Sequence, residues 1–155
     1  MNEVTLLLCA AASPVLLGIY LNSCKVAQFC DTQKTDIALV QNFAKALEWL
    51  QTNHCEIAKL IIARGPGSNT SLMLSYLFAQ TIAIAKNIPV AGVESFALNG
   101  NQPIFAFGQS YFVKQDDTIA LVKNVESGCF ALPQNLADLP CTSDCEPLYV
   151  LSPLG

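Results

Sequence analysis

The first thirty residues carry three apolar blocks separated by turn-forming residues. Residues 5–11 form a continuous apolar run, which is typical of a strand that is buried on both faces of a sheet. Pro14 interrupts the pattern, and the next two blocks, residues 15–21 and 24–29, are separated only by Asn22-Ser23. The pattern therefore predicts three strands that are joined by two antiparallel hairpins.

Further along the chain, apolar residues recur at helical spacing in two places. We expect a first helix over residues 36–53, with Thr32 or Thr35 as its N-cap. Its apolar stripe holds Ile37, Val40, Phe43, Ala44, Leu47 and Leu50. We expect a second helix over residues 70–86, with Asn69 or Thr70 as its N-cap. Strands at residues 57–64 and 89–93 flank this helix, and residues 94–98 add one helical turn.

Beyond residue 100 the pattern weakens and turn formers become frequent. Short strands are expected at residues 104–107, 111–114 and 118–123, with a last strand at Tyr149–Leu151. The sequence therefore predicts an N-terminal lobe over residues 1–100 and a smaller C-terminal lobe over residues 101–155.

The second helix differs from an ordinary surface helix because residues 65–85 contain no charged side chain. A helix that is apolar on all sides must be covered on more than one side. Its own domain can cover one side, so we expect a partner protein to cover another. Small side chains at every fourth position, Ser71, Ser75, Ala79 and Ala83, form one line along the helix and predict a close packing contact.

Composition narrows the classes of function. The chain of 155 residues is 52% hydrophobic and 13% charged, which excludes a disordered chain and indicates a large core or an apolar binding surface. The net charge is −4 and the eight basic residues are scattered, so tight direct binding of nucleic acid is not expected. Residues 5–20 are apolar, but Pro14 and the absence of preceding basic residues favour buried strands over a signal peptide, and a cytoplasmic protein.

Candidate chemistry is sparse. The seven cysteines are odd in number and irregularly spaced, which favours free thiols, and we expect no zinc site at Cys141 and Cys145. His54 is the sole histidine and follows the first helix, where a surface position is expected. Arg64-Gly65-Pro66-Gly67-Ser68, followed by Thr70, lies between a strand and a helix, where such a loop can hold a phosphate. The loop lacks the P-loop lysine and Pro66 lacks a donor, so a structural turn is the favoured interpretation, and we expect no catalytic group, metal or cofactor.

A family resemblance rests on this loop and on the helix and strand after it. The stretch Ala63-Arg64-Gly65-Pro66-Gly67-Ser68-x-Thr70, the small-residue helix and the segment Asn87-Ile88-Pro89-Val90-Ala91-Gly92-Val93-Glu94-Ser95 resemble the TsaB/YeaZ family. The resemblance implies an actin-like ATPase (ASKHA, RNase H-like) α/β fold, with a mixed sheet flanked by helices and a reduced second lobe. It also implies a non-catalytic partner of a TsaD-like enzyme, which works with a TsaE-like ATPase to place threonylcarbamoyl on adenosine 37 of tRNA.

Several positions depart from the family pattern. Family members carry an aspartate in the first strand-turn that helps to position a metal-bound nucleotide in the actin-like fold, and here the matching residue is Ala10. This substitution argues against ATPase activity. The phenylalanine of the motif is Asn69, its arginine is Met73, and its helix glycines are Ser71 and Ser75. The chain therefore resembles a divergent and shortened member.

The favoured hypothesis is a scaffold that binds a TsaD-like enzyme through its two helices, as the resemblance implies, and touches tRNA only indirectly. The expected partner interface consists of Val40, Phe43, Leu47, Leu72, Tyr76, Ala79 and Ala83. Two alternatives stay open. One is a nucleotide-binding ATPase or peptidase-like enzyme of the actin-like superfamily, and the other is a structural homodimer that pairs through the same helices.

Overall fold

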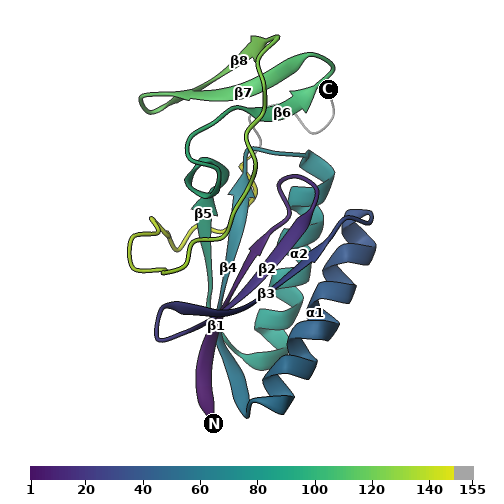
Figure 1. The fold of residues 1–155 in the computed structure, drawn as a ribbon, viewed down its shortest axis with the longest axis vertical. Helices are drawn as coiled ribbons and strands as arrows, with labels where there is room; N and C mark the ends of the chain where they lie inside the picture. Colours follow the sequence, from purple (N-terminus) through teal and green to yellow (C-terminus); the bar gives the residue numbers. More distant parts are fainter. Residues whose placement is uncertain (149–155) are drawn as a thin grey trace.

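A computed structural model of the chain describes residues 1–148, and the strand expected at Tyr149–Leu151 lies outside these residues. The other predicted elements are present, within a few residues of their expected bounds (Figure 1). In chain order they are β1 (Asn2–Cys9), β2 (Val15–Leu21), β3 (Cys24–Asp31), α1 (Thr35–Thr52), β4 (Cys55–Gly65), α2 (Asn69–Lys86), β5 (Val90–Glu94), the 3-10 helix η1 (Ser95–Leu98), β6 (Ile104–Phe107), β7 (Ser110–Gln115) and β8 (Thr118–Lys123).

The larger sheet is mixed and has the strand order β3-β2-β1-β4-β5. The predicted hairpins are confirmed, because β1 pairs antiparallel with β2 and β2 antiparallel with β3. Asn22 and Ser23 both have positive φ, as a two-residue hairpin turn requires. The remaining pairs, β1 with β4 and β4 with β5, are parallel, and α1 and α2 form the crossovers.

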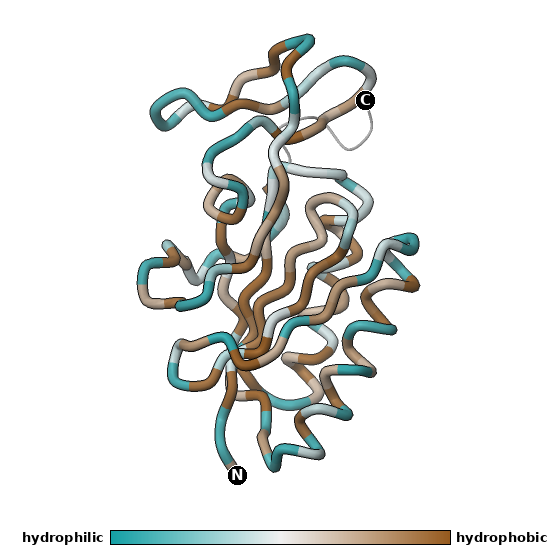
Figure 2. Tube along the Cα trace, viewed as in Figure 1, coloured by the Kyte–Doolittle hydropathy of each residue, from teal (hydrophilic) through white to brown (hydrophobic). Residues whose placement is uncertain are grey.

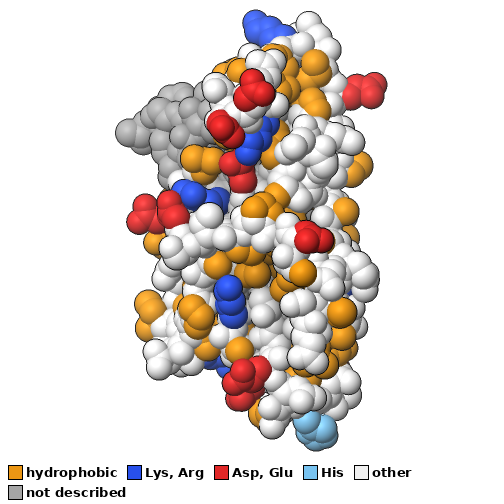
Figure 3. All heavy atoms as spheres, turned by 90° about the vertical axis from the view of Figure 1, so that its left-hand side faces the viewer, with side chains coloured by type: hydrophobic (Ala, Val, Ile, Leu, Met, Phe, Trp, Pro, Cys, Tyr) orange, Lys and Arg blue, Asp and Glu red, His pale blue; other side chains and the backbone are white. Residues whose placement is uncertain are grey.

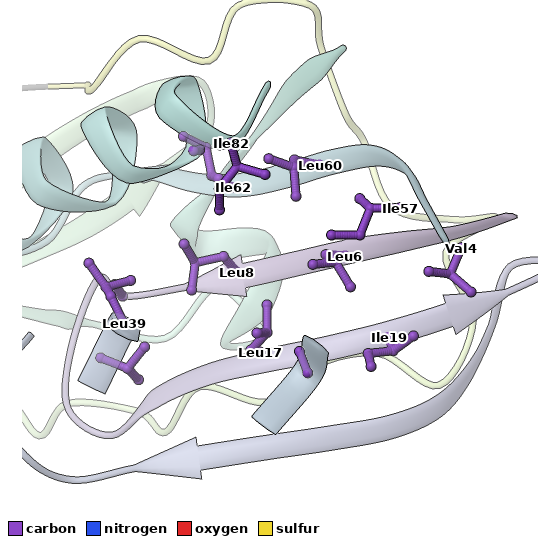
Figure 4. Packing of buried hydrophobic residues seen from close by; sticks show 14 of the residues in the cluster. Val4, Leu6, Leu8, Leu17, Ile19, Leu39, Ile57, Leu60, Ile62 and Ile82 are labelled. Carbon is purple, nitrogen blue, oxygen red and sulfur yellow. The ribbon is translucent and has the colours of Figure 1, made fainter. Parts of the chain in front are cut away.

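The central strands bury side chains on both faces of the sheet. Along β1, Leu6 and Leu8 point to one face and Leu7 and Cys9 to the other, and all four are buried. The first face packs against α1 and α2, where Leu39 and Ile82 meet the strand side chains (Figure 4). In Figure 2 the strands of this sheet are coloured hydrophobic over most of their length.

The second face is covered by the segment of residues 129–148, which we call the strap. It has no regular secondary structure over most of its length, and it returns from the small sheet to run beside β5 and the larger sheet (Figure 1). Leu132 is buried in the core of this face, and Phe130, Leu136, Leu139 and Cys141 pack around it. The strap therefore supplies the second apolar layer that the sheet needs.

Backbone hydrogen bonds tie the strap to both ends of the strand order. At the β3 end, Lys25 N donates to Gln134 O at 2.9 Å, and Leu136 N donates to Ser23 O at 2.9 Å. At the β5 edge, Gly92 and Thr142 exchange two bonds of 2.8 Å. These bonds pair part of the edge backbone that would otherwise remain open.

Glycines make room for the strap. A Cβ on Gly18 would lie 2.9 Å from Leu132 Cδ1, and a Cβ on Gly92 would collide with the backbone oxygen of Asp144. No side chain fits at either position without displacement of the strap or its neighbours.

The smaller sheet, β6-β7-β8, is antiparallel throughout. Its inner face contributes Ile104 and Phe112 to a small core with Phe96 of η1. A second link is the ion pair between Lys114 of β7 and Glu94 of β5, with 2.6 Å between Nζ and Oε1. The boundary predicted at residue 100 separates the two sheets, but the strap belongs to the larger one, so the division into 1–100 and 101–155 stays a prediction.

The predicted helix caps are wrong. Lys34 occupies the N-cap position of α1 without a side-chain cap bond, and Ser68 caps α2 by accepting a hydrogen bond from Ser71 N. Thr35 Oγ1 instead lies 2.7 Å from Ser71 Oγ and links the N-terminal ends of the two helices. Among residues 1–148, no helix combines the length and the hydropathy that a membrane crossing requires.

We predict that Gly92→Ala loosens the strap. The added methyl group must displace the Asp144 backbone, which should lower the free energy of unfolding by about 1–3 kcal/mol. Hydrogen exchange of the Thr142 and Leu148 amides should become faster. The control is Gly108→Ala, because a Cβ there meets nothing within 4 Å and only the positive φ is unfavourable. Equal exchange rates at these amides in both variants would contradict the prediction.

Candidate functional site

The buried side of α1 is not the side that carries most of the predicted apolar stripe. The side that packs on the sheet holds Leu39, Ala46 and Leu50, which are all buried. Val40 and Leu47, both predicted interface residues, are on the other side, with 61% and 40% of their surface exposed. Most of the predicted apolar stripe therefore faces away from the core, whereas its last residue, Leu50, belongs to the buried side.

One polar side chain lies on the core side of α1. Asn42 is fully buried, and its Nδ2 donates to the backbone oxygen of Val15 at 3.0 Å. This bond fixes α1 to the start of β2 at the end of the sheet where the helix begins. The burial of Asn42 explains why hydropathy alone did not reveal which side of α1 faces the sheet.

The small residues of α2 face the sheet of this chain. Ser75, Ala79 and Ala83 are buried, and their size lets α2 approach the strands closely. The predicted contact is thus an internal one. Leu72, Ala79 and Ala83 must be removed from the expected partner interface, because this chain already covers them to 1%, 1% and 8% exposure.

The outer side of the two helices carries exposed large apolar side chains, although α1 also exposes Asp36, Lys45 and Glu48. We call it the helix face and define it by its exposed large side chains, Ile37, Val40, Leu47, Met73, Leu77 and Ile84. Phe43 of α1 and Phe78 of α2 pack edge to face beneath it, with ring centroids 5.4 Å apart. Phe43 and Tyr76 of the predicted interface are half-buried, and their part in partner binding stays a prediction.

Four of these residues, Ile37, Met73, Leu77 and Ile84, were not among the predicted interface residues. Met73, Leu77 and Ile84 lie on one side of α2, with Leu77 one turn after Met73 and Ile84 two turns after Leu77, and Ile84 is 79% exposed. Charged residues usually mark the solvent-exposed side of a helix. Because α2 has no charged residue before Lys86, its exposed side could not be located in this way.

The motif loop is held by packing and by backbone bonds. Gly65 has a φ of +125°, which requires glycine, and a Cβ on Gly67 would lie 2.6 Å from Ala11 O. Ser68 N donates to Ala11 O at 3.2 Å, and Ser68 Oγ caps α2. The peptide bond between Gly65 and Pro66 is cis. Arg64 points to the strap and Thr70 is exposed, so the loop fits the expected structural turn.

A cleft of about 1010 Å³ lies between the helix N-termini and the smaller sheet. One wall carries hydroxyl groups and Lys34, and the other carries Phe105, Phe107 and Phe112. The described lining includes no carboxylate. Ala10, the position that matches the family aspartate, packs in the core with 2% exposure. The described lining therefore offers hydroxyl and amide oxygens, but no carboxylate, to the cation of a metal-bound nucleotide.

The thiols and the histidine remain separate. His54 is exposed after the end of α1, and no three His, Cys, Asp or Glu side chains within residues 1–148 are placed to hold a metal ion. Burial raises the pKa of the Cys9 thiol to about 12, and burial also raises the pKa of Cys141. Cys145 accepts a hydrogen bond of 3.3 Å from Gln80 Nε2.

Comparison with known proteins gives a match to a family model over part of the chain and a likeness in fold. Residues 34–109 match the family model of TsaD, described as tRNA N6-adenosine threonylcarbamoyltransferase. No curated protein matches the chain.

Two solved structures from Pseudomonas aeruginosa are similar to the chain. YeaZ has a TM-score of 0.60 and 16% identity, over 88% of this chain and 73% of that one. An uncharacterized protein with similarity to peptidase YeaZ has a TM-score of 0.59 and 15% identity, over 88% of this chain and 72% of that one. The predicted resemblance is therefore confirmed, and the fold is the actin-like ASKHA fold, with a five-stranded mixed sheet and flanking helices.

The raised pKa of Cys9 predicts a stability effect at high pH. The thiol is neutral in the folded chain up to about pH 12, whereas it ionises from its ordinary value of 9.0 once unfolded. The contribution of the neutral Cys9 thiol to the free energy of unfolding is fully present below pH 9.0, and it is lost as the pH rises toward 12. Within that window the free energy of unfolding should fall by about 1.4 kcal/mol per pH unit because of this thiol.

Denaturant titrations at several pH values measure this effect. Tyr20 also titrates in the window, because burial raises its pKa to about 12, so the comparison must be with Cys9→Ala. The wild-type curve should be steeper than that of the variant above pH 9.0. Parallel curves would show that Cys9 contributes nothing.

Proposed function

We propose that this chain, which is similar in fold to YeaZ and matches the TsaD family model over residues 34–109, is a non-catalytic scaffold for a TsaD-like enzyme and supports threonylcarbamoylation of adenosine 37 in tRNA. It binds that enzyme as a heterodimer, works together with a TsaE-like ATPase, and contacts tRNA only through the complex. We also place it in the cytoplasm, where tRNA modification occurs, with no cofactor of its own.

The observation that carries the proposal is the helix face. An apolar surface built from two adjacent helices is the natural complement of a second helix pair, because helices pack side by side through such stripes. Val40, Leu77 and Ile84 are each more than half exposed, and this chain has no other described segment that covers them. The uncharged sequence of α2 lowers the desolvation cost of burying this surface against a partner.

The expected binding energy is concentrated in a few side chains. Burial of one large apolar side chain contributes roughly 1.5–3 kcal/mol, so two or three anchors are enough for stable association. We assign this role to Val40 and Leu47 on α1 and to Leu77 and Ile84 on α2. The internal position of Ala79 and Ala83 excludes them as anchors.

The non-catalytic part of the proposal is supported by two positions. The methyl group of Ala10 lies in the core where the family carries an acid, and Gly67 and Ser68 of the motif loop are engaged with Ala11. The loop backbone thus supports the fold. When the TsaD-like enzyme is absent, the same helix face would pair two copies of this chain.

We predict that Val40→Asp and Leu77→Asp each weaken binding to the TsaD-like enzyme by tenfold or more, because a charge replaces a buried apolar anchor. Both side chains are exposed in the free chain, so circular dichroism and thermal unfolding should change little. The matched control is Val26→Asp, which alters an exposed valine on β3. Affinity would be measured by isothermal titration calorimetry with the purified enzyme.

The cellular test is deletion followed by nucleoside analysis of tRNA. Threonylcarbamoyladenosine should disappear and should return with the wild-type chain or the Val26→Asp variant, but not with the double variant Val40→Asp/Leu77→Asp. Retention of the modified nucleoside after deletion would refute the proposed role. Unchanged affinity of the double variant would refute the helix face as the binding surface.

A further inference from the structure

A second pocket, separate from the helix face, lies at the carboxyl ends of β4 and β5. It has a volume of about 510 Å³ and is lined by Arg64, Glu94, Ala97, Asn101, Lys114, Pro140, Thr142 and Leu148. Gly65 and Glu94 are paired in the sheet register, so Arg64 and Glu94 leave neighbouring parallel strands at the same edge. This is the edge at which open α/β sheets hold their ligands.

Charged groups are concentrated at this pocket although they are scarce in the chain. The two ion pairs found among residues 1–148 both contribute to its lining, Arg64 with Asp144 at 3.1 Å and Lys114 with Glu94 at 2.6 Å. The four residues come from β4, the strap, β7 and β5. Figure 3, which views the molecule from the β5 side, shows acidic and basic side chains gathered in its upper part.

The cationic groups retain unused donors. Arg64 Nε donates to Glu146 O at 2.9 Å and Nη2 meets Asp144, whereas Nη1 has no partner within residues 1–148. Lys114 Nζ has three protons and, in the described part of the chain, one acceptor, Glu94. Arg64 and Lys114 are only 21% and 27% exposed, so their remaining donors lie in a partly desolvated space. A ligand that fills it must supply acceptor oxygens.

We propose that this pocket binds a small oxyanion, a phosphate or carboxylate group, between Arg64 and Lys114. Guanidinium groups recognise such groups through two parallel hydrogen bonds, and the ammonium of Lys114 adds a point charge from the opposite sheet. The ligand thereby bridges the larger and the smaller sheet. This proposal does not depend on the role of the helix face.

Asp144 does not line the pocket, but in the free chain its carboxylate is paired with Nη2 of Arg64 at 3.1 Å. Its side chain is 57% exposed, much more than that of Arg64, so the carboxylate is the partner that can leave at low cost. An incoming oxyanion replaces Asp144 on the Nη edge of Arg64, while the Nε bond to Glu146 O holds the guanidinium in place. Asp144 is therefore a built-in competitor for the ligand.

The test uses inorganic phosphate and the full chain, with amide and Arg64 Hε signals followed by NMR. Phosphate should shift the signals of Arg64, Lys114 and Thr142, and sodium chloride at the same ionic strength should not. Asp144→Asn should bind phosphate about twofold to fivefold more tightly, the range that a half-exposed ion pair is worth. Asp138→Asn removes the same charge from an exposed strap position and should leave affinity unchanged.

Two further variants address the cations. Lys114→Gln should weaken phosphate binding severalfold, whereas Lys123→Gln, which removes an exposed lysine of β8, should not. A parallel titration with acetate distinguishes a carboxylate ligand from a phosphate ligand, and specific shifts with either support the oxyanion site. Equal shifts with sodium chloride, or equal affinities for Asp144→Asn and Asp138→Asn, would overturn the proposal and leave the ion pairs as structural links.

Discussion

The central strands of the larger sheet are apolar on both faces, and burial of both faces is the constraint on which the other features depend. Leu6 and Leu7 are neighbours in the sequence, point to opposite sides, and are both almost completely buried. A domain of this size has to find two separate covers for one sheet. Two helices cover the first face and the irregular strap covers the second. The composition of the helices and of the strap follows from the need to bury these two faces.

The helix layer is thin, and this explains its unusual surface. One row of helices separates the sheet from the surroundings, so each helix has an inner side toward the strands and an outer side that nothing in residues 1–148 covers. On α2 the inner side is built from small residues such as Ala79, which bring the helix close to the strands. The outer side keeps large apolar residues such as Leu77, where an ordinary surface helix would carry charges. The chain thus keeps an exposed apolar surface on the outer side of its helix layer.

Much of the fold could be predicted from the sequence, because apolar runs and helical spacing mark the strands and both helices. The orientation of the helices could not, since both sides of α2 are apolar and the buried side of α1 contains Asn42. The line of small residues was correctly seen as a close contact, but its partner is the sheet of this chain. The resemblance at Arg64–Thr70 predicted the fold family, which no periodicity could supply.

The position of the strap and the two pockets could not be predicted from the sequence, for a different reason. The strap makes its contacts through irregularly spaced residues and through backbone groups opposite Gly18 and Gly92, which leave no periodic pattern. The two ion pairs at the oxyanion pocket bring together side chains from four segments, β4, β5, β7 and the strap, that are far apart in the chain. Arg64 is part of a recognisable motif, but no pattern in the sequence indicates that Lys114 and Asp144 lie near it.

The strap also affects how the chain folds. Tyr20 Oη donates to Pro133 O at 2.6 Å, a contact between residues 113 positions apart. Contacts of such long range raise the contact order and slow the search for the native state. On the ribosome, the first strands emerge long before the segment that must cover them, so the sheet stays open on one face until the strap has been synthesised. A nascent chain of this protein therefore exposes one apolar face of its sheet, and such a surface favours aggregation and chaperone binding.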